Sequence, residues 1–257
     1  MGRGHRAATP RVGLISVSAS SLIDFTQVEL AEVSRHYGRR RALARTSLTF
    51  RAGEIVGLFG PNGAGKSTML SVIATMVRPT SGTVTYGGAT AKSLGDPLRG
   101  RIGVLGHDLF LYGDLTAREN LEFFGRLYSV DRLGERVEAA LAAARLTERA
   151  NDRVSAFSRG LRQRLALERA LLHSPRLVLL DEPFTGLDDE STALLTARLR
   201  QLRDSGAIVL MATHDFENAD DLIDRMICLR DGRVREVPDT RGNLRVRYRQ
   251  AMAEAWS

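Results

Sequence analysis

A glycine-rich loop between a predicted strand and a predicted helix constrains the fold of this chain more than any other feature. The apolar run at 54–59 is typical of a short strand, and residues 67–76 are typical of a helix. The loop between them fits the phosphate-binding pattern G-x-x-x-x-G-K-[ST], which requires this strand–loop–helix context. Its residues are Gly60, Pro61, Asn62, Gly63, Ala64, Gly65, Lys66, Ser67 and Thr68.

The chemistry of this loop predicts that it binds the phosphates of a nucleotide. Glycines let consecutive backbone N–H groups converge on phosphate oxygens, and the helix amino end adds the positive end of its dipole. Lys66 supplies a compact positive charge, and the Ser67 hydroxyl can hold Mg²⁺. Only two of the 37 basic residues are lysines, Lys66 and Lys92, so lysine is kept where a compact ammonium group must reach phosphates.

A second apolar run, at 177–180, ends in the carboxylates Asp181 and Glu182. Its length is typical of a buried parallel strand, and ligands bind at the carboxyl ends of such strands. Asp181 is therefore predicted to hold the metal, and Glu182 to act as the general base on the attacking water. Alone, such a run is more often a strand that ends in a solvated turn; the glycine-rich loop favours the catalytic interpretation.

Three further segments follow in a fixed order. They are Phe-Ser-Arg-Gly-Leu at 157–161, Thr-Gly-Leu-Asp at 185–188 and Ala-Thr-His-Asp at 212–215. With the loop and the Asp-Glu-Pro strand, this order over residues 26–235 resembles the nucleotide-binding domain of ABC transporters. The resemblance implies an α/β P-loop NTPase core (an ABC ATPase), a small antiparallel β portion and a helical lobe at about 100–160. Residues 1–25 are predicted to be a disordered extension, and residues 236–257 a basic tail.

The resemblance also implies ATP and Mg²⁺ as cofactors, and a head-to-tail dimer in which each ATP lies between two subunits. The P-loop of one subunit faces the signature segment of the other, where Ser158 caps a predicted helix. A histidine that follows a strand is more often a loop residue whose hydrogen bonds are made locally, without a role in catalysis. The residues around His214, however, match the family's switch position. The implied contacts are Tyr37 on adenine, Ser158 and Gly160 on the second subunit's ATP, Asp188 near the seam and His214 at the γ-phosphate.

The sequence departs from the family pattern at several positions. Where most members have glutamine, this chain has His107, which could hold Mg²⁺ and whose charge can change near neutral pH, so we expect metal affinity or coupling to depend on pH. Arg159 stands where glycine is usual. Its side chain either contacts phosphate or an acidic neighbour, or is simply exposed to solvent. Glu168 replaces a small residue and is predicted to pair with Arg164, four residues earlier.

The helical lobe is expected to receive a coupling helix from a separate membrane subunit. Residues 114–128 have apolar side chains at helical spacing. Leu105-Gly106-His107 and the signature and Asp-Glu-Pro segments resemble the ATP-binding subunit of the haem exporter of cytochrome c maturation (CcmA). We therefore expect a peripheral ATPase at the cytoplasmic face of the membrane that powers haem export. The alternatives are an exporter of drugs or lipids, or a non-transport ABC ATPase acting on DNA, ribosomes or a division complex.

Composition limits the remaining possibilities. The net charge is +7, but the arginines are spread along the chain without interleaved aromatics, so no nucleic-acid partner is expected. The apolar runs fall far short of the roughly 18 residues of a membrane-spanning helix. The single Cys228 excludes an intrachain disulfide. No direct haem binding is expected, since no C-x-x-C-H motif or evident axial pair is present. The basic C-terminal tail is expected to be frayed and solvated, or else to lie near anionic lipid.

Overall fold

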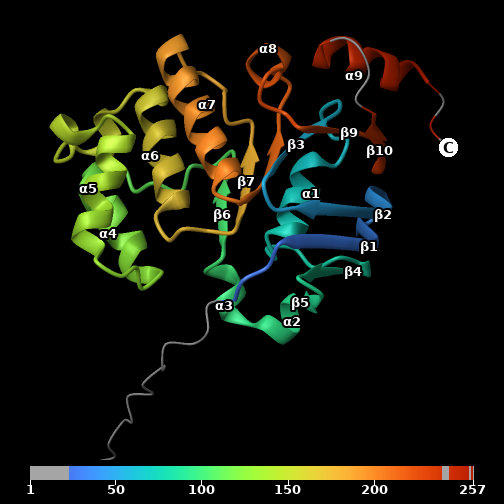
Figure 1. Cartoon of the computed structure of the whole chain (residues 1–257), viewed down its shortest axis with the longest axis horizontal. Helices are drawn as coiled ribbons and strands as arrows, with labels where there is room; N and C mark the ends of the chain where they lie inside the picture. Colours follow the sequence, from blue (N-terminus) through green and yellow to red (C-terminus); the bar gives the residue numbers. More distant parts are fainter. Residues whose placement is uncertain (1–22, 239–242, 255, 257) are drawn as a thin grey trace, which may run out of the picture.

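The computed structural model describes residues 23–238, 243–254 and 256, in two sheets with helices around them (Figure 1). Residues 1–22 of the predicted disordered extension lie outside this described part. For residues 23–25 the prediction is wrong, because Phe25 is buried in the core and Asp24 pairs with Arg176. Among the described residues, no helix combines the length and the apolar character that crossing a bilayer requires.

The larger sheet has six strands in the order β10-β9-β3-β8-β7-β6. All neighbours in it are parallel except the hairpin of β9 and β10. The central strand β8 is apolar and buried along its whole length, as a parallel sheet covered on both faces requires. The strands are β3 (Glu54–Phe59), β6 (Ile102–Leu105), β7 (Leu177–Asp181), β8 (Ile208–Ala212), β9 (Arg225–Arg230) and β10 (Arg233–Val237).

The smaller sheet is antiparallel, in the order β2-β1-β4-β5. Helix α1 (Lys66–Ile73) contributes Met69 and Ile73 to a core shared by both sheets. The strands are β1 (Gln27–Tyr37), β2 (Arg40–Arg51), β4 (Ser81–Tyr86) and β5 (Ala89–Thr90), followed by the short helices α2 (Ala91–Leu94) and α3 (Asp96–Arg99).

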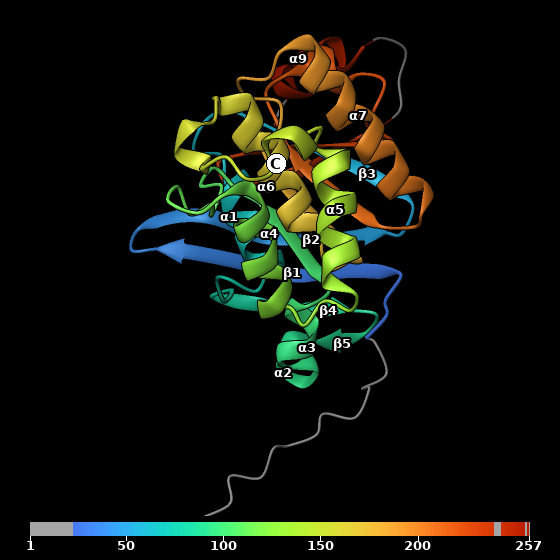
Figure 2. The ribbon, with the colours of Figure 1, turned by 90° about the vertical axis from the view of Figure 1, so that its left-hand side faces the viewer.

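The other face of the larger sheet is covered by helices that share a second core. These helices are α6 (Arg159–Leu171), α7 (Asp189–Asp204), α8 (Phe216–Ala219) and α9 (Leu244–Ala253). A third core joins α6 to a helical group that projects to one side of the sheets in Figure 1 and faces the viewer in Figure 2. This group contains α4 (Ala117–Leu127), α5 (Leu133–Ala143) and the 3₁₀ turns η1 (Thr147–Arg149) and η2 (Val154–Ala156).

The C-terminal segment differs from the expected frayed tail, because residues 244–253 form the helix α9. Asn243 caps it by accepting a hydrogen bond from the Val246 N–H. Leu244 and Ala251, two turns apart, are buried against the sheet's second core. These apolar residues stand among many arginines, and they give the helix a short apolar stripe that it can bury.

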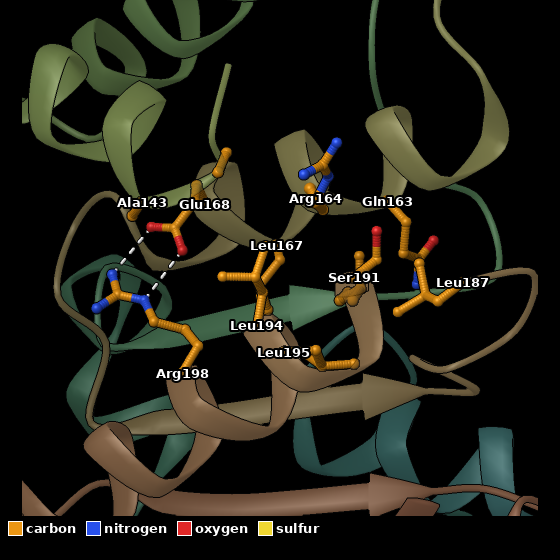
Figure 3. A pocket seen from close by; sticks show the side chains of 12 residues that line it. Ala143, Gln163, Arg164, Leu167, Glu168, Leu187, Ser191, Leu194, Leu195 and Arg198 are labelled. Carbon is orange, nitrogen blue, oxygen red and sulfur yellow. Dashed lines mark hydrogen bonds and ion pairs between the residues drawn. The ribbon is translucent and has the colours of Figure 1, made fainter. Parts of the chain in front are cut away.

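The predicted pairing of Glu168 with Arg164 is wrong. Glu168 on α6 is 3% exposed and pairs with Arg198 on α7 through two parallel hydrogen bonds, both 2.9 Å long (Figure 3). Burial raises the pKa of the Glu168 carboxyl, and Arg198 acts in the opposite direction. An arginine on the facing helix can direct both arms of its guanidinium at the Glu168 carboxylate. An arginine one turn away on the same helix, such as Arg164, is less well placed to do so.

Candidate nucleotide site

The glycine-rich loop turns sharply between β3 and α1. Gly65 has φ 116°, in the left-handed region that favours glycine, and a Cβ there would clash with the carbonyl oxygen of Ala42 on β2. A Cβ at Gly60 would clash with the carbonyl oxygen of Leu229 on β9. Both glycines therefore let the loop run directly against neighbouring strands, which fixes its shape.

The amino end of α1 fits a phosphate group. Gly65 is the N-cap and no side chain caps the helix, so the N–H groups of its first turn remain available to an anionic ligand. The Lys66 ammonium group folds back onto the loop and donates to the carbonyl oxygens of Gly60 at 2.7 Å and Pro61 at 3.3 Å. Among the described residues no acidic side chain lies in the first turn of α1, so this end of the helix is electropositive.

An open hollow lies over this loop and reaches the carboxyl ends of β6 and β7. The structure thus brings the P-loop together with His107 and with the two carboxylates predicted from the separate apolar run. The lining residues are Arg40, Asn62, Gly63, Gly65, Lys66, Ser67, Thr68, His107, Asp181 and Glu182.

Glu182 is held in a defined position at the end of β7. Its N–H donates to the carbonyl oxygen of Ala212 on β8 at 2.8 Å, and its φ of 53° is unusual for a residue with a side chain. The carboxylate oxygen Oε2 lies 2.8 Å from Nδ1 of His214 and accepts a hydrogen bond from the His214 N–H at 3.2 Å. The predicted base and the predicted switch histidine are therefore in contact across neighbouring strands.

The donor set beside the loop fits Mg²⁺. Ser67 supplies a hydroxyl and Asp181 a carboxylate, and both line the same hollow as His107. Mg²⁺ usually binds one or two protein oxygens and takes its other ligands from phosphates and water. Within the described residues no group of three or more His, Cys, Asp and Glu side chains could hold a metal ion.

Ser158, Gly160 and Asp188 do not line this hollow. Ser158 caps α6 by accepting from the Leu161 N–H at 3.3 Å, and Asp188 caps α7 by accepting from the Ser191 N–H at 2.8 Å. The hydrogen bonds from Ser191 lower the pKa of Asp188. The amino ends of α6 and α7 therefore form a second polar surface on the same subunit, apart from the P-loop.

Tyr37 and Arg159 also have defined surroundings. The Tyr37 ring, 46% exposed, lies outside the hollow at the end of β1, with the Arg35 guanidinium 4.5 Å from its centre. The exposed Arg159 side chain lies along Gly186, so close that a Cβ at Gly186 would meet its Cδ at 2.7 Å.

Sequence reasoning missed Arg40. This residue starts β2 and donates from Nη2 to the carbonyl oxygen of Gly63 at 2.8 Å, at the rim of the hollow. The sequence offered one indication of its role: Arg40 lies three residues after Tyr37, the predicted adenine contact, and pairs with it across a tight hairpin. The run of arginines at 39–41 gave no reason to single out one of them.

The fold and the hollow together define a P-loop nucleotide-binding protein with an acidic strand end beside its phosphate loop. The sequence pattern of the ABC transporter family matches residues 43–185. The chain belongs to the ABC transporter family, and its ATP-binding cassette is an ATPase.

Proteins similar to this chain carry several names. NatA of Bacillus subtilis, an ABC transporter ATP-binding protein, is 37% identical over 80% of this chain and 87% of its own length. The Nod factor export ATP-binding protein I of Rhizobium johnstonii is 39% identical over 84% of this chain and 70% of its own length. The linearmycin resistance ATP-binding protein LnrL of B. subtilis is 34% identical over 80% of this chain and 67% of its own length.

Solved structures agree with the fold. An ATP-binding subunit of an ABC transporter superposes with a TM-score of 0.76 at 28% identity, over 90% of this chain and 95% of that chain. The ATP-binding cassette MJ0796, in a dimeric post-hydrolysis state with ADP and phosphate, superposes with a TM-score of 0.73 at 31% identity, over 83% of this chain and all of that chain. These similarities confirm the predicted ABC ATPase fold.

Proposed function

We propose that this chain is the ATP-hydrolysing subunit of an ABC exporter, works as a head-to-tail dimer and powers a separate membrane subunit at the cytoplasmic face. The observation that carries the proposal is the contact of Glu182 with His214 at the edge of the hollow that holds Lys66 and Asp181. The export and resistance functions in the names of two similar proteins support transport over action on DNA or ribosomes.

Hydrolysis follows from the groups in the hollow. Lys66 and the first N–H groups of α1 bind the phosphates, while Ser67, Asp181 and His107 hold the metal. Mg²⁺, when bound, neutralises the charge that develops on the phosphates. Glu182 orients the attacking water and accepts its proton, and His214 keeps the Glu182 carboxylate in place and contacts the γ-phosphate.

Ser158, Gly160 and Asp188 explain why a dimer is needed. They lie at the amino ends of α6 and α7, which suit an anion, yet outside the hollow of their own subunit. A second copy turned head to tail places this surface over the P-loop of the first. Such an arrangement uses the same two surfaces on both subunits, so it closes as a two-fold dimer.

An exposed apolar surface on the helical lobe suits the membrane subunit. Phe123 and Leu127 on α4 are 43% and 67% exposed, and Phe110 and Tyr112, in the segment after His107, are 55% and 50% exposed. The rings of Tyr112 and Phe123 meet edge to face at 5.1 Å. We call these four residues the aromatic patch. The exposed apolar side chains of the patch suit a helix from the membrane subunit. Because Phe110 and Tyr112 follow His107 closely in the chain, such a helix would be linked to the nucleotide site.

Leu127→Asp is expected to move the protein from the membrane fraction to the supernatant of lysed native cells, while the ATPase turnover of the purified chain stays within about twofold of wild type. A charge in the aromatic patch removes the apolar contact but lies outside the nucleotide hollow. Val246→Asp, which alters an exposed apolar residue on α9, is the matched control and should stay with the membrane. Membrane retention of Leu127→Asp would exclude the patch as the docking surface.

We propose export of a cargo other than haem, without naming that cargo. The similar proteins described above have names that concern Nod factor, linearmycin and NatA rather than haem, so an exporter of another cargo is better supported than the haem exporter expected from the sequence. Haem remains a second candidate because His107 lines the hollow at the position where most family members have glutamine.

Deletion of the gene tests the haem candidate. If haem export is the function, the deletion strain loses holo c-type cytochromes and keeps b-type cytochromes, and a Lys66→Ala copy does not restore them. Haem staining of denaturing gels detects the covalently attached haem of c-type cytochromes, and reduced-minus-oxidised absorption spectra of membranes measure the b-type cytochromes. Normal c-type cytochromes in the deletion strain would exclude haem and leave an exporter of a different cargo.

A further inference from the structure

The C-terminal helix α9 packs against the segment that carries His214. Three aromatic rings connect them: Tyr248 on α9 lies 5.0 Å from Phe216, and Phe216 stacks on Phe59 at 5.1 Å with nearly parallel rings. Phe216 follows His214 by two residues, and Phe59 directly precedes Gly60 of the P-loop. The ring of Tyr248 is therefore one wall of a cluster that joins the switch segment to the phosphate loop.

Polar contacts fix α9 to α8 as well. The Leu244 N–H donates to Oδ1 of Asp220 at 2.6 Å, and Arg245 on α9 pairs with Glu217 on α8 at 3.2 Å. Figure 1 shows the two helices side by side at the same end of the molecule. Helix α8 is only four residues long, so these contacts and the ring cluster hold it from outside.

The far side of α9 is anchored to the β9–β10 hairpin. Arg235 on β10 pairs with Glu254 at 2.7 Å and lies 5.1 Å from the Trp256 ring. Arg233 donates to the carbonyl oxygen of Trp256 at 3.2 Å. Helix α9 thus spans from the sheet to the switch segment and can transmit the rigidity of the sheet to it.

We propose that α9 is a brace for the switch segment and that Tyr248 is a positioning residue for ATP hydrolysis, acting through Phe216 on His214. The proposal rests on the proposed function, in which His214 holds Glu182 and contacts the γ-phosphate. The His214 side chain is 74% exposed, so its own packing does little to fix it. Its backbone N–H donates to Glu182, and the segment that follows it is held by the packing of Phe216. Displacement of a catalytic group by about 1 Å can cost a hundredfold in rate.

Steady-state phosphate release by the purified full chain tests the brace. Tyr248→Ala should lower kcat by about tenfold and leave KM and the affinity for ATP within about twofold, because the P-loop and Asp181 are untouched. Tyr248→Phe keeps the ring and should restore wild-type kcat. Val246→Ala alters an exposed residue on α9 outside the ring cluster and should leave kcat within about twofold. An unchanged kcat in Tyr248→Ala, or an equal fall in Val246→Ala, would overturn the proposal.

A double variant separates positioning through His214 from general loss of structure. If Tyr248 acts through His214, then Tyr248→Ala adds no further loss of kcat in a His214→Ala background. A further tenfold loss there would overturn the proposal. Lys66→Ala separates failure of the brace from failure of the proposed function. If Lys66→Ala abolishes turnover while Tyr248→Ala has wild-type kcat, only the brace is wrong. Turnover that survives Lys66→Ala contradicts the nucleotide site itself.

Discussion

ATP turnover is expected to fall by about 10³-fold in Glu182→Gln, while the affinity for ATP stays within about threefold of wild type. The amide cannot accept a proton from the attacking water, and general-base catalysis typically contributes a factor of this size. Lys66, Ser67 and Asp181 remain in place to hold the nucleotide. Phosphate release and titration with a fluorescent ATP analogue measure the two quantities separately.

The same variant should accumulate as a dimer when ATP and Mg²⁺ are present, because the nucleotide that joins the two subunits is no longer hydrolysed. Gel filtration with and without Mg-ATP detects the change. Glu135→Gln, which alters an exposed glutamate on α5 that is paired with Arg132, is the matched control and should turn over normally. Wild-type turnover in Glu182→Gln, with monomer only, would show that Glu182 is not the base.

Arg198→Leu should lower the free energy of unfolding by about 3 kcal/mol at pH 8, because it leaves the buried Glu168 carboxylate without its partner. Arg200→Leu, which alters an exposed arginine two residues further along α7, should cost less than about 0.5 kcal/mol. Replacing both partners, as Glu168→Met with Arg198→Leu, should recover most of the loss, since a buried ion pair can be exchanged for apolar packing. Urea unfolding measures each value; a loss below 1 kcal/mol in Arg198→Leu would contradict the prediction.

The destabilisation by Arg198→Leu should also depend on pH. Burial raises the pKa of Glu168 in the folded protein, and removing Arg198 raises it further. Below the unfolded-state pKa, near 4.3, the carboxyl is protonated in both states and the burial cost is small. As pH rises toward the folded-state pKa, the folded protein binds more protons than the unfolded one, so stability falls. The gap between variant and wild type should therefore be smaller at pH 5 than at pH 8.

Local patterns predicted the parts of the site that each come from one short segment. The glycines, Lys66 and Ser67 follow one strand and precede one helix, and Asp181 and Glu182 end another strand, so spacing alone indicated their chemistry. Their meeting in one hollow follows from the parallel sheet, in which the ends of β3 and β7 lie at the same edge.

Contacts between distant segments could not be predicted in the same way. Spacing within one helix predicts Arg164 as the partner of Glu168, whereas its true partner, Arg198, lies on a different helix. The ring cluster joins Phe59 to Phe216 and Tyr248, which both lie more than 150 residues further along the chain, and none of the three has a motif that indicates the others. Such pairings depend on how helices cross the sheet, which a single sequence does not specify.

Mixing two inactive variants tests the central claim most directly, since each ATP is proposed to need Lys66 of one subunit and Ser158 of the other. Lys66→Ala and Ser158→Arg should each be inactive alone. In an equal mixture, half of the dimers pair the two variants and contain one complete site, so phosphate release should recover to about a quarter of wild type. A mixture no more active than its separate components would contradict the head-to-tail dimer.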